Sequence, residues 1–207
     1  MTRLILGLGN PGDEYRATRH NAGFRVVEEL ARRWGARLDR LECNALTASV
    51  ETPAPVLLAK PQTYMNRSGF AARCLVELHG LDPGAVLVVY DEINLPFGRL
   101  RLRRAGSPAG HRGMESILEN LRTDQVPRLR LGIGVPDGAS AVAGEEAGAG
   151  LVDFVLSPFA PAEEEGAAEM VRRAADACEA WLREGIDAAM QRFNTGAAAE
   201  VVTGEQG

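Results

Sequence analysis

Short apolar segments alternate along this chain with segments that have the periodicity of helices. Residues 3–9 and 85–92 are strongly apolar, and this pattern predicts buried strands. Between them, apolar residues at helical spacing predict helices over residues 22–34 and 66–79. Strands that alternate with helices usually form one sheet with helices packed on it. The sequence therefore predicts the α/β class, as a single domain with a twisted, mixed β-sheet flanked by helices.

The remaining segments complete this organisation. Asn21, which ends a polar loop, is a candidate cap for the helix that follows. Further strands are expected at residues 45–50, 55–60, 99–103 and 128–135, and further helices at residues 114–122 and 161–193. The low-complexity segment 137–150 is expected to be a mobile surface loop and residues 195–207 a disordered tail, so that the domain spans residues 1–194.

Polar, turn-rich loops follow three of the expected strands, at residues 10–21, 61–66 and 91–98. In open α/β sheets, ligands bind beyond the carboxyl ends of the strands. The three loops therefore predict a functional site at one edge of the sheet.

The distribution of charge keeps a polyanionic partner possible. The formal net charge of −5 argues by itself against nucleic acid. However, residues 1–131 carry 19 Lys and Arg against 14 Asp and Glu, whereas residues 132–207 carry 4 against 14. The acidic C-terminal third thus masks a basic middle, in which Arg101 and Arg103 alternate with leucine along an expected strand. Such arginines are candidates for phosphate contacts, or else a solvated strand face.

Cysteine usage and hydropathy give the expected location. Cys43, Cys74 and Cys178 are odd in number and lie far apart, which predicts neither a disulfide framework nor a zinc site. No apolar stretch approaches the roughly 18 residues that a membrane span needs, and the first residues lack the features of a signal peptide. We therefore expect a cytoplasmic protein.

Two loop residues have the chemistry of a general base and its carboxylate partner. His20 ends the first polar loop, and an imidazole is the natural base at neutral pH, although a lone histidine is more often a surface or cap residue. Asp91, at the end of an apolar strand, could orient that imidazole and stabilise its charged form, or be an ordinary turn residue. There is no G-x-S-x-G motif, so a base without a side-chain nucleophile indicates hydrolysis by activated water. The histidines show no metal-binding spacing, and neither a metal nor a cofactor is expected.

A glycine motif supports a different function. Residues 7–12, GLGNPG, match the G-x-G-x-x-G pattern of dinucleotide-binding oxidoreductases. In that pattern a helix begins within the motif and an acidic residue follows about 20 residues later. Here a polar loop follows, and the nearest acids, Glu28 and Glu29, lie inside an expected helix. The alternative is a tight turn that carries a functional Asn10.

Six segments together resemble the bacterial-type peptidyl-tRNA hydrolases. They are GLGNPGDEYRATRHNAGF (7–24), KPQTYMNRSG (60–69), VVYDEINLPFGRLRLR (88–103), AGSPAGHRGMESI (105–117), RLRLGIG (128–134) and FVLSPF (154–159). The resemblance implies a monomeric cytosolic α/β enzyme. Such enzymes cleave the ester between a peptide, or an N-blocked amino acid, and the 3′ ribose of tRNA, and so recycle tRNA from aborted translation.

The resemblance also implies roles for particular residues. His20 becomes the base that activates water, Asp91 the residue that orients it, and Asn10 the residue that senses the blocked amino group. The positions implied for contact with substrate or tRNA are Tyr15, Tyr64, Asn66, His111, Arg101 and Arg103.

One residue departs from the pattern of the family. Arg112 stands where the family usually has asparagine, in the segment G-H-x-G. An arginine keeps hydrogen-bond donors, loses the acceptor and adds a charge, so substrate affinity is expected to change while the chemistry is retained. This departure is the one feature that favours the second alternative, an RNA-binding relative without activity.

Overall fold

The computed structural model describes residues 2–51, 54–135 and 145–195. Its centre is one mixed sheet with the strand order β2-β3-β4-β1-β5-β7-β6. The strands are β1 (Arg3–Gly7), β2 (Arg40–Glu42), β3 (Ala45–Val50), β4 (Val56–Pro61), β5 (Val86–Glu92), β6 (Leu100–Arg103) and β7 (Arg128–Gly132). The four central strands β4, β1, β5 and β7 are parallel, whereas the β2–β3, β3–β4 and β6–β7 pairs are antiparallel. The predicted mixed sheet is therefore confirmed.

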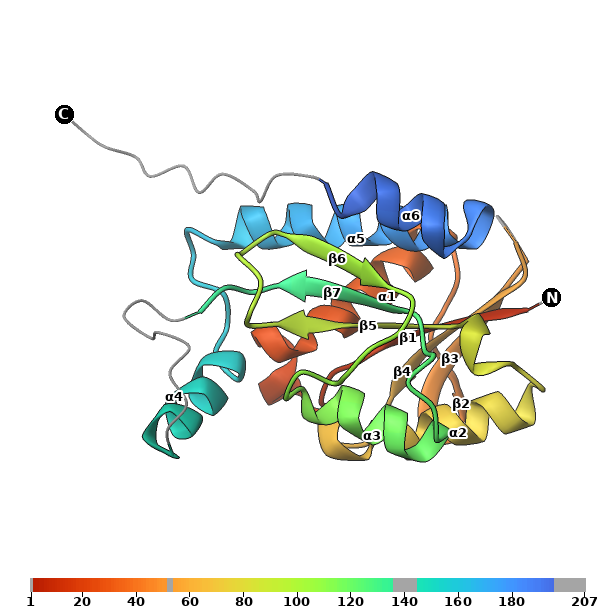
Figure 1. The fold of residues 1–207 in the computed structure, drawn as a ribbon, viewed down its shortest axis with the longest axis horizontal. Helices are drawn as coiled ribbons and strands as arrows, with labels where there is room; N and C mark the ends of the chain where they lie inside the picture. Colours follow the sequence, from red (N-terminus) through yellow and green to blue (C-terminus); the bar gives the residue numbers. More distant parts are fainter. Residues whose placement is uncertain (1, 52–53, 136–144, 196–207) are drawn as a thin grey trace.

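Helices cover both faces of this sheet (Figure 1). They are α1 (Ala22–Arg33), α2 (Ser68–Leu78), α3 (Arg112–Leu121), α4 (Glu145–Val155), α5 (Glu164–Glu184) and α6 (Ile186–Phe193). Helices α1, α5 and α6 lie on one face, and α2 and α3 on the other. Helix α4 lies beside the end of the sheet that carries the predicted functional loops.

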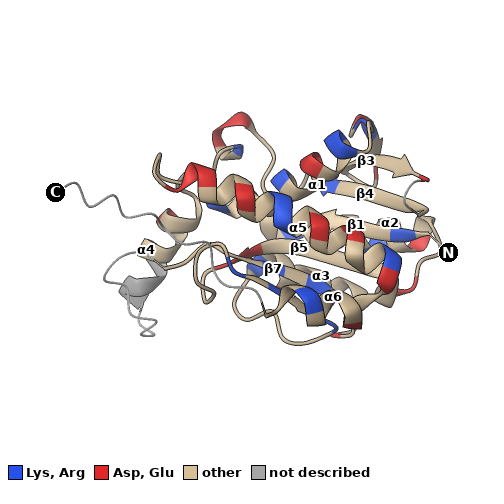
Figure 2. Cartoon of the chain, turned by 90° about the horizontal axis from the view of Figure 1, so that it is seen from above, with Lys and Arg blue, Asp and Glu red and all other residues tan. Residues whose placement is uncertain are grey.

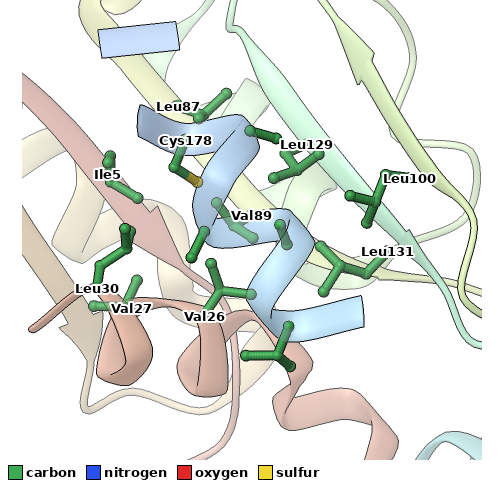
Figure 3. Close-up of a cluster of buried hydrophobic side chains, with 14 of the residues drawn as sticks. Ile5, Val26, Val27, Leu30, Leu87, Val89, Leu100, Leu129, Leu131 and Cys178 are labelled. Atoms are coloured by element: carbon green, nitrogen blue, oxygen red, sulfur yellow. The ribbon is translucent and has the colours of Figure 1, made fainter. Parts of the chain in front are cut away.

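Alternating side chains of the strands divide the apolar core into two layers. On β5, Leu87 and Val89 pack against α1 and α5 (Figure 3), whereas Val88 and Tyr90 point to the side of α2 and α3. All seven residues of β5 are buried, which explains its continuous apolar sequence. A carboxylate at the end of this strand is consequently held in a fixed position inside the molecule.

Glycines bring the start of α1 against the sheet. A Cβ atom on Gly23 would lie 2.3 Å from the carbonyl oxygen of Val89, and one on Gly7 would lie 2.3 Å from the carbonyl oxygen of Gly23. Only residues without side chains permit this approach. The close contact places the residues just before α1, including His20, beside the carboxyl end of β5.

The structure corrects three expectations about the elements. The helix expected over residues 161–193 is two helices, because Gly185 adopts φ 89° between α5 and α6. Of the segment 137–150, residues 137–144 lie outside the described residues. From Glu145 onward the segment is helical and not a loop, since Glu and Ala have high helix propensity. The expected tail lies outside the described residues from 196 onward.

The cysteines give a further correction. Cys43, in the turn between β2 and β3, forms a disulfide with Cys74 on α2. Because the two cysteines are 31 positions apart, only the packing of α2 against the sheet edge brings them together. The third cysteine, Cys178, lies on α5 and its side chain is buried in the core (Figure 3). Among the described residues, none of the helices is long and apolar enough to cross a membrane.

Candidate active site

The three predicted loops meet at one edge of the sheet, and this expectation is confirmed. They follow β1, β4 and β5, which are parallel neighbours, so their carboxyl ends lie side by side. Together with the start of α3 and one face of α4, they surround a cleft of about 500 Å³. The cleft is lined by Asn10, His20, Tyr64, Met65, Asn66, Asp91, Glu92, Ile93, Ala109, Gly110, His111, Arg112, Leu151, Val152, Val155 and Leu156.

His20 and Asp91 form a hydrogen-bonded pair on the wall of this cleft. The Nδ1 atom of His20 lies 2.9 Å from Oδ1 and 3.0 Å from Oδ2 of Asp91. Because an ionised carboxylate only accepts hydrogen bonds, this contact assigns the proton of the neutral ring to Nδ1 and leaves Nε2 as the basic atom. The side chain of Asp91 is 1% exposed and that of His20 is 14% exposed. The pair is thus largely shielded from water, which would otherwise weaken its electrostatic interaction.

The pair shifts the pKa values of both residues. Burial of the His20 ring lowers its pKa, but the charge of Asp91 and the hydrogen bond with it outweigh burial, so the pKa of His20 is raised above 6.5. The positive charge of Arg112 opposes this rise. Burial acts to raise the pKa of Asp91, yet His20 and His111 lower it well below its usual range. Asp91 therefore remains ionised, and His20 is a stronger base than a free imidazole.

His111 is a second partner of the same carboxylate. Its Nε2 atom lies 3.1 Å from Oδ1 of Asp91, and its Nδ1 atom accepts a hydrogen bond from the backbone N–H of Met114 at 3.2 Å. Both ring nitrogens are thus engaged within the protein, and the side chain is 8% exposed. Sequence reasoning treated His111 as a substrate contact. The geometry adds that it caps α3 and holds Asp91 in place, while its contact with the substrate stays a prediction, since His111 also lines the cleft.

Asn10 is held by hydrogen bonds that leave its amide donors facing the cleft. Its Oδ1 atom accepts a hydrogen bond from the backbone N–H of Met65 at 2.8 Å. Its backbone N–H and carbonyl pair with the side chain of Asn21 at 2.8 and 3.0 Å. Asn21 therefore fixes Asn10 and makes no side-chain cap on α1, contrary to expectation. The Nδ2 atom of Asn10 makes no hydrogen bond with any described residue and is free to donate to a ligand.

The other predicted substrate residues are only partly brought together. Tyr64 and Asn66 line the cleft from the segment after β4, and the ring of Tyr64 is exposed. Arg112, the first residue of α3, also lines the cleft and is exposed. Tyr15 lies in the short turn Asp13–Tyr15 and is not among the residues that line the cleft.

Sequence reasoning missed the contribution of α4. Leu151 and Val155, one helical turn apart, line the cleft together with Val152 and Leu156. The apolar run LVDFVL at residues 151–156 is a signal of this face, but it follows a low-complexity segment that suggested a surface loop. The apolar side chains of α4 give one wall of the cleft a low polarity.

Comparisons with known proteins agree with this geometry. A family model described as peptidyl-tRNA hydrolase matches residues 4–201. The peptidyl-tRNA hydrolase of Synechococcus sp. (strain JA-3-3Ab) is 46% identical over 194 residues, which cover 93% of this chain and 82% of that protein. The corresponding protein of Chloroflexus aurantiacus (strain ATCC 29366 / DSM 635 / J-10-fl) is 46% identical over 193 residues, which cover 92% of this chain and 98% of that protein.

This chain belongs to the peptidyl-tRNA hydrolase family. The crystal structure of peptidyl-tRNA hydrolase from Acinetobacter baumannii has the same fold, with a TM-score of 0.84 and 31% sequence identity. The match covers 94% of this chain and 95% of that one. The resemblance inferred from six motifs is therefore confirmed, and the chain is a hydrolase of this family.

The glycine motif at residues 7–12 is explained by the packing of α1 against the end of β1. A Cβ atom on Gly9 would lie 2.7 Å from Cγ of Phe24 on α1, so Gly9 permits the helix to pack closely. Helix α1 begins at Ala22, well after the motif, and not within it as in a dinucleotide site. The oxidoreductase alternative is therefore wrong.

His20, Asp91 and His111 are also the residue types of a metal site. One ligand atom from each lies within 4.8 Å of the others. Sequence spacing gave no signal of this cluster, because the three residues come from separate loops. In the structure both imidazoles direct a nitrogen at Oδ1 of the same carboxylate, at hydrogen-bonding distances of 2.9 and 3.1 Å. The absence of a metal from the mechanism stays a prediction.

Arginines of the peptidyl-tRNA hydrolase fold gather on one face of β6 and β7. Arg101 pairs in register with Arg130, and Leu100 and Leu102 point into the core on the opposite face. Mutual repulsion, chiefly from Arg103, lowers the pKa of Arg101. Six of the fourteen acidic residues of the C-terminal third lie on α5 (Figure 2), on the other face of the sheet.

Not every arginine of this region is available to a ligand. Arg128 is buried and donates hydrogen bonds to the carbonyls of Val126, Gly106, Ser107 and Asp124. Arg104 pairs with Asp187 on α6, and Arg130 pairs with Glu92. The charge count of the sequence therefore overstates the basic surface. Arg101 and Arg103 are half-buried and form no ion pair with a described residue.

Proposed function

We propose that His20 is the general base with which this chain hydrolyses the ester bond of peptidyl-tRNA. The observation that carries the proposal is the pair between Nδ1 of His20 and the ionised, buried carboxylate of Asp91, at 2.9 and 3.0 Å. Asp91 raises the pKa of His20, which makes the ring a stronger base for proton transfer from water. General-base assistance is worth about 10²–10⁴-fold in rate.

The reaction follows from the placement of this base. Nε2 of His20 removes a proton from a water molecule, whose oxygen attacks the ester carbonyl carbon. The tetrahedral intermediate then releases the 3′ oxygen of the ribose, which takes a proton from the imidazolium. The carboxylate of Asp91 stabilises the imidazolium while it exists and keeps the ring oriented. The products are a peptide carboxylate and tRNA with a free 3′ end.

Asn10 accounts for selection of blocked substrates. Its Oδ1 atom is occupied by Met65, so the group that it presents to the cleft is the Nδ2 donor. The carbonyl of a peptide bond, or of an N-acetyl group, accepts from this donor. A free α-amino group is charged and offers no acceptor, so aminoacyl-tRNA is spared.

The RNA part of the substrate lies on the arginine face of β6 and β7 in this proposal. The guanidinium groups of Arg101 and Arg103, which form no ion pair with a described residue, neutralise phosphates of the acceptor stem. Such contacts do not read base sequence, which suits an enzyme that acts on many tRNAs. Tyr64, Asn66 and Arg112 contact the 3′ end of the RNA or the first peptide unit, and Tyr15 remains a predicted substrate contact outside the cleft lining.

The direct test uses N-acetyl-aminoacyl-tRNA with a labelled amino acid. The wild-type protein is expected to release the labelled N-acetyl-amino acid, and His20→Ala to reduce kcat by about 10²–10⁴-fold with tRNA binding retained. A His20→Ala variant with normal turnover would remove His20 from the role of base. A wild-type protein that releases no label would overturn the proposed function itself.

We also propose that the enzyme acts as a monomer in the cytoplasm and without a cofactor. The catalytic pair, Asn10 and the arginine face all come from one chain, so the proposed reaction needs no second copy. Sedimentation at the concentration used for the assay tests this: turnover that appears only in a dimeric fraction would contradict it.

A further inference from the structure

A second hollow lies next to the catalytic cleft, and the mechanism above does not use it. It has a volume of about 500 Å³ and is lined by Asn44, Gln62, Thr63, Tyr64, Arg67 and Phe70. Tyr64 lines both this hollow and the cleft, so the two spaces are neighbours that share this side chain. A substrate that extends from the cleft past Tyr64 therefore enters the second hollow.

The walls of the hollow are exposed and apolar, with amides between them. Tyr64 is 59% exposed and Phe70 54% exposed, although both are large hydrophobic residues. The side chain of Asn44 makes no hydrogen bond with a described residue, and Gln62 leaves its side-chain oxygen free as an acceptor. Apolar rings with unpaired amides suit a polypeptide, which offers both side chains and backbone hydrogen-bonding groups.

The two sides of the hollow are held together by a backbone hydrogen bond and by the packing of α2. Asn44 belongs to the turn before β3, and Phe70 lies on α2 one helical turn before Cys74, whose Cα atom lies 5.6 Å from that of Cys43 in the same turn. The backbone N–H of Gln62 also donates to the carbonyl of Asn44 at 2.7 Å. The hollow is therefore preformed, which lowers the entropic cost of binding.

The position of the hollow decides which half of the substrate it can take. It lies beside β3 and β4, whereas the arginine face lies on β6 and β7, at the other edge of the sheet. The reacting carbonyl carbon of the ester carries the peptide on one side and the ribose oxygen of the tRNA on the other, and these two parts extend in different directions. If phosphates lie on the arginine face, the acyl end extends toward the hollow.

The charge of the hollow agrees with this assignment. Arg67 is the single cation among its lining residues, and its guanidinium lies over the ring of Phe70, 5.9 Å from the centroid. Grooves that follow a nucleic-acid backbone present several cations. With one cation in its lining, the hollow does not have the charge of such a groove.

We propose that this hollow is a subsite for the peptide, and binds residues that lie upstream of the one joined to the tRNA. The inference rests on the proposed function, because it needs the ester to be cleaved at His20. It implies that the enzyme distinguishes substrates by peptide length: a single blocked amino acid is too short to pass Tyr64, whereas a longer peptide reaches Phe70 and Arg67.

The test compares two substrates that share the same tRNA and the same esterified residue. One is N-acetyl-aminoacyl-tRNA, and the other carries an N-acetylated tripeptide. Phe70→Ala is expected to lower kcat/KM for the tripeptidyl substrate by about fivefold, which corresponds to about 1 kcal/mol, and to leave the short substrate unchanged. Arg67→Gln is expected to show the same selectivity with a smaller loss.

The matched control is Leu78→Ala. Leu78 lies on the same helix, is 60% exposed and does not line the hollow, so both substrates are expected to react at wild-type rates. An equal loss on both substrates in Phe70→Ala would assign the hollow to the 3′ end of the RNA and overturn the proposal, as would no loss on either. Wild-type turnover of the short substrate tests the proposed function separately.

Discussion

The variant Asp91→Asn isolates the charge that supports the base. The substitution keeps the shape of the side chain and removes its negative charge. An oxygen at the position of Oδ1 can still accept from both His20 and His111, which lie 2.9 and 3.1 Å from that atom. The amide nitrogen then takes the position of Oδ2, 3.0 Å from Nδ1 of His20. Because the amide N–H and the Nδ1–H of His20 are both donors, they cannot form a hydrogen bond with each other. The fold is therefore retained while the imidazolium loses its counter-charge.

The size of the effect follows from the geometry. A hydrogen bond to a charged group contributes about 1.5–3 kcal/mol, and Asp91 makes such a bond with His20 in a site shielded from water. At 1.36 kcal/mol for each factor of ten, its loss lowers kcat by about 10- to 150-fold. A variant that also changes the tautomer of the ring falls at the upper end of this range.

The pH profile gives an independent readout. His20 must be neutral to accept a proton, so activity increases as pH rises through its pKa. Asp91 raises that pKa above 6.5, and the acidic limb of kcat/KM is expected above this value in the wild-type protein. Without the charge of Asp91, burial lowers the pKa, and the limb moves to lower pH while the plateau falls.

The assay is release of labelled N-acetyl-amino acid between about pH 5 and pH 9. The control is Glu92→Gln, which removes the neighbouring buried carboxylate that pairs with Arg130 and makes no contact with His20. It is expected to leave the acidic limb in place. The reasoning is refuted if Asp91→Asn retains kcat within about threefold of wild type, or if its acidic limb moves upward.

Three further predictions concern recognition and charge. Asn10→Asp keeps the acceptor for Met65 but removes the donor in the cleft, and its negative charge attracts a free amino group. The ratio of kcat/KM for blocked over unblocked aminoacyl-tRNA should therefore fall about tenfold. An unchanged ratio would contradict the role of Asn10. Arg103→Ala should raise KM and reduce the slope of log binding constant against log salt concentration by roughly one; equal slopes would place Arg103 outside the phosphate contacts. Arg112→Asn removes a charge that lowers the pKa of His20, so the acidic limb should move to higher pH. A shift of the limb to lower pH would contradict this role of Arg112.

Local patterns predicted most of the secondary structure. The apolar run that became β5 and the helical spacing that became α1 are both formed by neighbours in the sequence, so their elements could be read directly. The break at Gly185 could not be distinguished from a tolerated glycine in a continuous helix. The helix at Glu145–Val155 was obscured because Gly and Ala dilute its pattern.

The candidate site divides in the same way. His20 and Asp91 could be named from loop position and residue chemistry, together with the resemblance to a family. The binding of His111 to the same carboxylate could not be inferred, because its segment reads as an ordinary loop before a helix. The hydrogen bonds between the side chain of Asn21 and the backbone of Asn10 could not be inferred either, since asparagine before a helix most often predicts a cap.

The order of residues alone determined an α/β sheet with polar loops at strand ends, because periodicity and turn chemistry act over a few neighbouring positions. Tertiary structure alone decided that one buried carboxylate serves two imidazoles and that the disulfide joins a turn to α2 beside a second hollow. Those contacts join residues 20 to 71 positions apart, and their geometry depends on how closely α1 and α2 pack against the strands. Packing distances of this kind are set by the whole core, which no short segment of sequence encodes.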